Sequence, residues 1–165
     1  MPVDKPDRLV SLVRDGLPAG ETIGIALSGG GDSTALLHLA LRAGLRVEAV
    51  TVDHRLRAES AAEAAGVAEA CARLGVPHQV KVWEHGPVTG NLMDAARRAR
   101  MGLIRDWAVA REIRHVALGH TRDDQAETLL MGLARRAGID GLAGMRRAWV
   151  EAGVCLLYTS PSPRD

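Results

Sequence analysis

The stretch IGIALSGGGDSTALL, which begins at Ile23, constrains the fold more than any other part of this sequence. An apolar run leads into three consecutive glycines, which Ser28 and Asp32 flank, and a run of helix-forming residues follows. Consecutive glycines destabilise regular structure and allow positive φ angles. The pattern predicts a buried strand over 23–27, a loop, and a helix over 33–43. Such a loop is typical of a backbone that must come close to a ligand.

The rest of the chain alternates between short apolar runs, which predict strands, and longer segments with apolar residues at helical spacing. Helices of ten or more residues between strands favour right-handed βαβ units and a parallel sheet covered on both faces. We therefore expect an α/β, Rossmann-like fold. The expected strands are 23–27, 46–53, 76–82 and 115–118, and the expected helices are 5–15, 33–43, 58–74, 91–111 and 122–134.

Length and composition fit one soluble globular domain of 165 residues, with 47% hydrophobic and 25% charged residues. The net charge of +1 gives no global steering toward nucleic acid. An aromatic content of 2% argues against recognition of single-stranded nucleic acid by stacking. Cys71 and Cys155 form no CxxC pair, so zinc and iron–sulfur sites lack ligands.

No segment resembles a signal peptide, because the first residues, MPVDKPDRLVSLVRDG, carry charges throughout. No apolar run approaches the length that spans a membrane. We expect a cytoplasmic protein that has no membrane partner.

The unusual segments of the sequence all follow expected strands. They are 28–33, 53–57, 83–91 and 119–127. Ligands of open parallel sheets bind beyond the carboxyl ends of the strands. The sequence therefore predicts an active site at this edge of the sheet.

The glycine loop predicts a phosphate site, because a strand–loop–helix unit presents backbone N–H groups and the positive end of a helix dipole. Neither GxxxxGK[ST] nor GxGxxG is present, so the loop is not a Walker A motif or a dinucleotide fingerprint. A tight turn without a ligand is the alternative, but it would not require this much polar chemistry. The candidate phosphate-binding residues are Ser28, Gly29, Gly30, Gly31, Asp32 and Ser33.

The loop SGGGDS resembles the SGGxDS pyrophosphate loop of the N-type ATP pyrophosphatases, the PP-loop superfamily. Three further segments resemble, in order and spacing, the N-terminal catalytic domain of tRNA(Ile)-lysidine synthase. They are VDHRLRAESAAEA from residue 52, NLMDAARRAR from residue 91 and GHTRDDQAETLLMGLARRAGIDGLAGM from residue 119. The resemblance covers about residues 20 to 150 and implies an adenine nucleotide alpha hydrolase-like fold.

The resemblance also implies a ligase that forms a carbon–nitrogen bond in two steps. ATP would first adenylate the C2 oxygen of the wobble cytidine in a tRNA(Ile) with a CAU anticodon. The amine of L-lysine would then attack C2 and expel AMP, which gives lysidine. ATP and Mg²⁺ are the implied cofactors, with Asp32 helping to hold the ion beside the pyrophosphate.

One further group of candidate residues follows the second expected strand, and another lies on the expected helix over 91–111. Asp53 and His54 would lie near the adenosine, although His54 as a packed histidine is equally compatible with the pattern. Arg97 and Arg100 could contact phosphate or the cytidine adenylate, because arginine presents a fixed fork of donors. A solvated basic helix face is the alternative for both.

A third candidate group stands at i, i+4 and i+7 on one helix face: His120, Asp124 and Glu127. The carboxylates could orient the ammonium of lysine, and either they or His120 could accept its proton. Acids in a first helical turn also interact favourably with the helix dipole. That alternative does not explain why His120 and Glu127 would lie on the same helix face as Asp124.

The resemblance stops near Val154, whereas the catalytic domain of the family continues further. We therefore expect a truncated catalytic domain over 1–154 and a disordered or non-native tail over 155–165. Two functional alternatives stay open: another PP-loop enzyme such as a tRNA thiolase, and a non-catalytic ATP-binding module. The oligomeric state also stays open, and a homodimer is one option.

Overall fold

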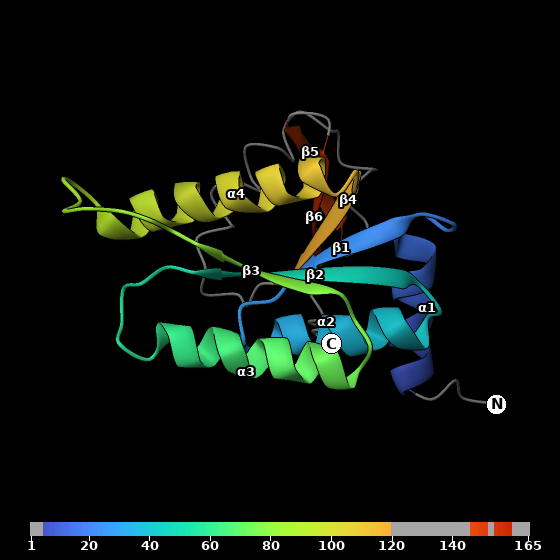
Figure 1. Cartoon of the computed structure of the whole chain (residues 1–165). Helices are drawn as coiled ribbons and strands as arrows, with labels where there is room; N and C mark the ends of the chain where they lie inside the picture. Colours follow the sequence, from blue (N-terminus) through green and yellow to red (C-terminus); the bar gives the residue numbers. More distant parts are fainter. Residues whose placement is uncertain (1–4, 120–145, 152–153, 160–165) are drawn as a thin grey trace.

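The computed structural model describes residues 5–119, 146–151 and 154–159 as a single sheet with helices packed on both of its faces (Figure 1). The helices are α1 (Lys5–Gly16), α2 (Gly31–Arg42), α3 (Ser60–Arg73) and α4 (Leu92–Ala110). The strands are β1 (Thr22–Ala26), β2 (Arg46–Asp53), β3 (His78–Val82), β4 (His115–Gly119), β5 (Arg146–Glu151) and β6 (Val154–Thr159).

The sheet has the order β3-β2-β1-β4-β6-β5. The pairs β3–β2, β2–β1, β1–β4 and β4–β6 are parallel, and only β5–β6 is antiparallel. The expected parallel α/β architecture is confirmed, and its four expected strands form the run β3-β2-β1-β4. The antiparallel edge formed by β5 was not predicted.

The two faces of the sheet carry separate apolar cores. α1, α2 and α3 cover one face, where Ile23, Ile25 and Leu37 belong to one buried cluster (Figure 1). α4 covers the other face, where Trp107 and Ile104 pack with residues of β2, β4 and β6. Trp107 is 1% exposed and supplies bulk in a chain that has no Phe.

The expected disordered tail is wrong for residues 155–159, which belong to β6. The register runs from His115 opposite Cys155 to Gly119 opposite Thr159, and Leu156 is fully buried against the α4 side of the sheet. The physical reason is strand pairing: β4 has a second edge with backbone groups to satisfy, and an apolar segment can occupy it. The local sequence gives no sign of that vacant edge.

α4 begins where the sequence supplies a capping side chain. The Oδ1 atom of Asn91 accepts hydrogen bonds from the backbone N–H groups of Met93 (3.0 Å) and Asp94 (3.2 Å). Both donors belong to the first turn, whose N–H groups have no intrahelical partner. Asn91 therefore acts as an N-cap and sets the direction of the helix that carries Arg97 and Arg100. Among the described residues, no helix is long and apolar enough to cross a bilayer.

Candidate functional site

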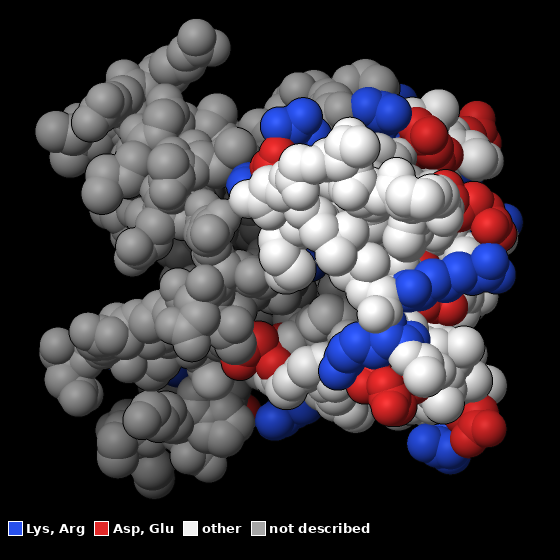
Figure 2. All heavy atoms as spheres, turned by 90° about the vertical axis from the view of Figure 1, so that its left-hand side faces the viewer, with Lys and Arg blue, Asp and Glu red and all other residues white. Residues whose placement is uncertain are grey.

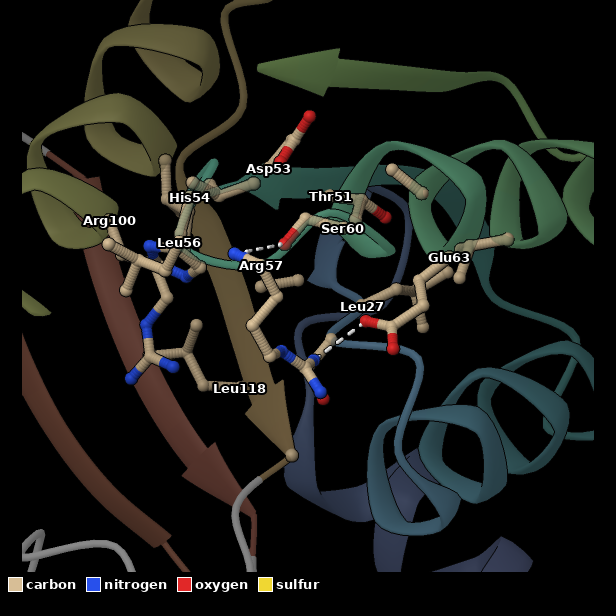
Figure 3. A pocket seen from close by; sticks show the side chains of 17 residues that line it. Leu27, Thr51, Asp53, His54, Leu56, Arg57, Ser60, Glu63, Arg100 and Leu118 are labelled. Carbon is tan, nitrogen blue, oxygen red and sulfur yellow. Dashed lines mark hydrogen bonds and ion pairs between the residues drawn. The ribbon is translucent and has the colours of Figure 1, made fainter. Parts of the chain in front are cut away.

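A pocket of about 180 Å³ lies beyond the carboxyl ends of β1, β2 and β4, the sheet edge at which the sequence predicts a site (Figure 3). α3 and α4 contribute its remaining walls. The lining residues are Ala26, Leu27, Ser28, Thr51, Val52, Asp53, His54, Leu56, Arg57, Ser60, Glu63, Ala64, Val67, Arg100, Ile104, Leu118 and Gly119.

The glycine loop connects β1 to α2, and a network centred on Ser33 fixes its shape. The buried Ser33 Oγ donates to the carbonyl oxygen of Gly30 (3.1 Å) and accepts from the backbone N–H of Ser28 (3.2 Å). The Ser28 Oγ accepts from the N–H of Gly30 (3.3 Å). Gly29 has φ +84°, a conformation that favours glycine. The two serines therefore hold the loop in shape.

The backbone N–H groups at the start of α2 are the anion-binding feature of this loop. The first N–H groups of a helix have no intrahelical partner and lie at the positive end of its dipole. α2 begins at Gly31, and a Cβ placed on Gly31 would meet no atom within 4 Å, so this part of the backbone is open to a ligand. A helix start of this kind can bind a phosphate group, and phosphate binding by this loop stays a prediction.

Gly119 lets β4 end directly against this loop. A Cβ on Gly119 would lie 2.7 Å from the Cα of Ser33 and 2.9 Å from its backbone nitrogen. No side chain fits at those distances, so the loop and the end of β4 share one wall of the pocket. The sequence alone does not reveal this close approach, because in the sequence Gly119 only marks the end of an expected strand.

Asp53 and His54 end β2 in a turn. The buried Asp53 Oδ1 accepts from the N–H of Arg55 (2.9 Å), which has φ +51°. The Asp53 carbonyl accepts from the N–H of Trp83 (2.9 Å), and Figure 3 shows the Asp53 carboxylate turned away from the two labelled arginines. Asp53 therefore shapes the β2–α3 turn, and its contact with a ligand stays a prediction.

The ring of His54 contributes an unsatisfied polar atom to the pocket. Its Nδ1 is buried and has no hydrogen-bond partner in the described part of the chain. Burial lowers the pKa of His54, and the positive charge of Arg100 adds to this effect, while Asp53 opposes it. The ring is therefore neutral near pH 7, and its Nδ1 is left without a hydrogen bond among the described residues.

Arg57 and Glu63 form a charged pair at the pocket that sequence reasoning did not select. The Arg57 Nη2 lies 2.9 Å from the Glu63 Oε2, and the Arg57 N–H donates to the Ser60 Oγ (3.4 Å; Figure 3). Both residues also line a second groove, which runs between α2 and α3 and includes Ser28, Gly29 and Gly30. Arg57 therefore places a guanidinium beside the glycine loop. Arg57 lies in the segment VDHRLR, which resembles the family pattern, and this resemblance was the signal that could have pointed to it.

The other candidates occupy different positions. Arg100 extends from α4 over the pocket, whereas Arg97 is not among the lining residues (Figure 3). Asp32 is half-buried in the first turn of α2 and has no ion-pair partner among the described residues. The described ranges contain no group of three or more His, Cys, Asp or Glu side chains arranged to hold a metal. His120, Asp124 and Glu127 lie outside the described residues.

A family model for the PP-loop domain matches residues 5–157. The chain belongs to the PP-loop domain family. The match spans every element from α1 to β4, and with them the glycine loop and the lining of the pocket.

Two curated relatives of this PP-loop chain carry the same name. It is 53% identical over 139 residues to tRNA(Ile)-lysidine synthase of Ruegeria pomeroyi, covering 82% of this chain and 33% of that protein. It is 44% identical over 129 residues to tRNA(Ile)-lysidine synthase of Zymomonas mobilis, covering 78% and 39%. The chain therefore spans between a third and two fifths of the length of these relatives.

Solved structures show the same fold at lower sequence identity. The PP-loop chain superimposes on the U34-tRNA thiolase NcsA from Methanococcus maripaludis with a TM-score of 0.64 and 17% identity, covering 83% of this chain and 52% of that one. It superimposes on the NH3-dependent NAD synthetase from Campylobacter jejuni with a TM-score of 0.54 and 18% identity, covering 77% and 58%. Both likenesses concern the fold alone.

Proposed function

We propose that this chain carries the ATP-dependent catalytic centre of a tRNA(Ile)-lysidine synthase. The observation that carries the proposal is the open helix start at Gly31, in the loop whose Ser28 lines the pocket. The residues that line this pocket lie within the segment related to enzymes of that name. The proposed reaction is adenylation of C2 of the wobble cytidine in tRNA(Ile) with a CAU anticodon. Attack by L-lysine then forms the carbon–nitrogen bond and releases AMP.

ATP would lie across the pocket with its pyrophosphate end on the glycine loop. The N–H groups at the start of α2 would bind phosphate oxygens, and Arg57 would add a positive charge at the same loop. His54 would offer its buried Nδ1 to the nucleoside part of the ligand. A phosphate subsite and a nucleoside subsite on the ends of neighbouring strands support a nucleotide of this size.

Mg²⁺ fits beside the pyrophosphate through Asp32. The carboxylate lies in the first turn of α2 and, within the described chain, has no ion-pair partner that would compete for it. One carboxylate combined with phosphate oxygens and water is a usual environment for this ion. When bound, Mg²⁺ would neutralise charge on the leaving pyrophosphate.

Arg100 is the residue that we propose to act on the reacting phosphate. Its side chain extends from α4 over the pocket, where a fixed guanidinium would stabilise the charge that develops at the α-phosphate during adenylation. Arg97, outside the pocket, would contact the RNA. His120, Asp124 and Glu127 would orient lysine and accept its proton, and which of them is the base stays open.

Release of pyrophosphate from ATP tests the proposal directly. The purified chain should release pyrophosphate only when tRNA(Ile) with a CAU anticodon is present, and lysidine should form when L-lysine is added. Asp32→Asn should abolish the release, whereas Asp106→Asn, on the exposed side of α4, should leave it unchanged. ATP binding without any RNA-dependent release would instead support a non-catalytic ATP-binding module.

A further inference from the structure

The loop between β3 and α4 brings two aromatic rings together beside the pocket. The rings of Trp83 and His85 lie 4.0 Å apart between centroids, with 31° between their planes. Trp83 is half-buried and His85 is exposed. Trp83 therefore covers one face of the imidazole, and the opposite face is left to solvent.

Both nitrogens of His85 are anchored to backbone oxygens. Its Nδ1 lies 3.0 Å from the carbonyl oxygen of Gly86, and its Nε2 lies 3.1 Å from the carbonyl oxygen of His54. These two contacts fix the orientation of the imidazole, which lies against the indole of Trp83.

A charged pair ties the same loop to the β2–α3 turn. The Nη1 of Arg55 lies 3.1 Å from the Oε2 of Glu84, and the Trp83 N–H is bonded to the carbonyl of Asp53. The Trp83 ring also meets His54 edge-on at 6.4 Å. A ring pair held in this way loses little conformational entropy when a ligand binds.

The position of the rings points to a nucleobase as the ligand. The carbonyl that anchors His85 belongs to His54, whose side chain lines the pocket together with Arg100. Unpaired RNA bases are bound by stacking on aromatic side chains. The face seen in Figure 2 has a broad uncharged area with both basic and acidic side chains at its border.

We propose that the Trp83–His85 pair is a stacking platform for an unpaired RNA base that neighbours the nucleotide held in the pocket. The proposal rests on the proposed function, because it assumes that RNA reaches this edge of the sheet. The low aromatic content of the whole chain argues against extensive base stacking. A single platform needs only two rings, and the loop between β3 and α4 supplies both.

The test measures binding of a fluorescein-labelled anticodon stem-loop with a CAU anticodon by fluorescence anisotropy. Trp83→Leu removes the ring but keeps an apolar side chain, and should weaken binding about tenfold or more. Trp83→Phe keeps a ring and should stay within about threefold of the wild-type protein. Gln79→Ala, an exposed change on β3, should leave binding unchanged.

Each outcome bears on the platform. Equal RNA affinity in Trp83→Leu and the wild-type protein, or no RNA binding by the wild-type chain, would overturn it. An equal loss of ATP affinity in Trp83→Leu, measured by calorimetry, would also overturn it, because the rings would then only support the pocket. A ring-dependent RNA affinity without pyrophosphate release would keep the platform and reject the proposed function.

Discussion

Gly119 at the end of β4 lies against the backbone of Ser33 in the first turn of α2, and this contact joins two segments of the pocket wall that are distant in sequence. Gly119→Ala would place a Cβ 2.7 Å from the Cα of Ser33, so the glycine loop has to move. We expect ATP affinity, measured by calorimetry, to fall about tenfold or more, since the N–H groups at the start of α2 would lose their alignment. A similar ATP affinity in Gly119→Ala and the wild-type protein would show that the loop moves without weakening ATP binding.

The control for this substitution is Gly102→Ala in the middle of α4. A Cβ there would meet only the end of the Arg105 side chain, at 3.8 Å. Alanine is favoured over glycine inside a helix by about 1 kcal/mol, so this variant should be at least as stable as the parent and bind ATP equally well.

Arg100→Ala should reduce the rate of pyrophosphate release by about 100-fold or more, while ATP affinity changes little. The reason is that a guanidinium acting on developing charge contributes more to the transition state than to the bound nucleotide. Steady-state release assays and calorimetry separate the two effects. Arg98→Ala, which breaks an exposed pair with Asp94, is the control. A loss confined to ATP affinity would contradict the assignment.

Acid should destabilise the protein through two histidines. Burial lowers the pKa of both His54 and His78 below the usual value of 6.5. As the pH falls below about 6.5, the unfolded chain takes up protons at these positions before the folded protein does, so the free energy of unfolding decreases. Urea unfolding between pH 7.5 and 5.5 should show this loss.

His78→Gln identifies one source of that pH dependence. The His78 Nε2 is hydrogen-bonded to the Thr51 Oγ1 at 2.8 Å, and glutamine offers a polar group that does not titrate. The stability of this variant should therefore fall less steeply as the pH is lowered. His38→Gln replaces an exposed histidine and should keep the parental slope. Identical slopes in all three proteins would exclude His78 as a contributor.

Leu156→Ala tests whether β6 belongs to the folded domain. Leu156 is fully buried in the cluster with Trp107, so truncation to alanine should lower the free energy of unfolding by about 2–5 kcal/mol. Urea unfolding followed by circular dichroism measures the change. Leu74→Ala, at a position that is 41% exposed, should cost much less. Equal stabilities for Leu156→Ala and the parent would place residue 156 outside the core.

Local sequence was sufficient to predict most of the described fold. The strand at 46–53 was predicted with the bounds that the structure shows, and the unit of β1, loop and α2 follows from one apolar run, three glycines and one helical period. Each of these features depends on neighbours along the chain. β6 could not be predicted in this way, because its residues form a strand only beside β4.

The candidate site was also predictable from the local sequence only in part. The ligand contacts of Ser28, Ser33 and Asp53 stay predictions. Only the structure shows the hydrogen bonds that they make within the loop and the β2–α3 turn. Arg57 was not selected, although it lies beside the loop. A motif identifies which residues gather at a site, but it does not identify which polar atoms the protein already satisfies.

The sequence by itself determined the succession of strands and helices, the glycine loop and the family to which the chain belongs. These depend on side-chain periodicity and on short runs of residues, which are local properties. The tertiary structure decided the contact of Gly119 with Ser33, the buried nitrogen of His54 and the anchored rings of Trp83 and His85. Each of these joins elements that are distant along the chain, and the distances between them are fixed only when the sheet and both of its helical layers pack together.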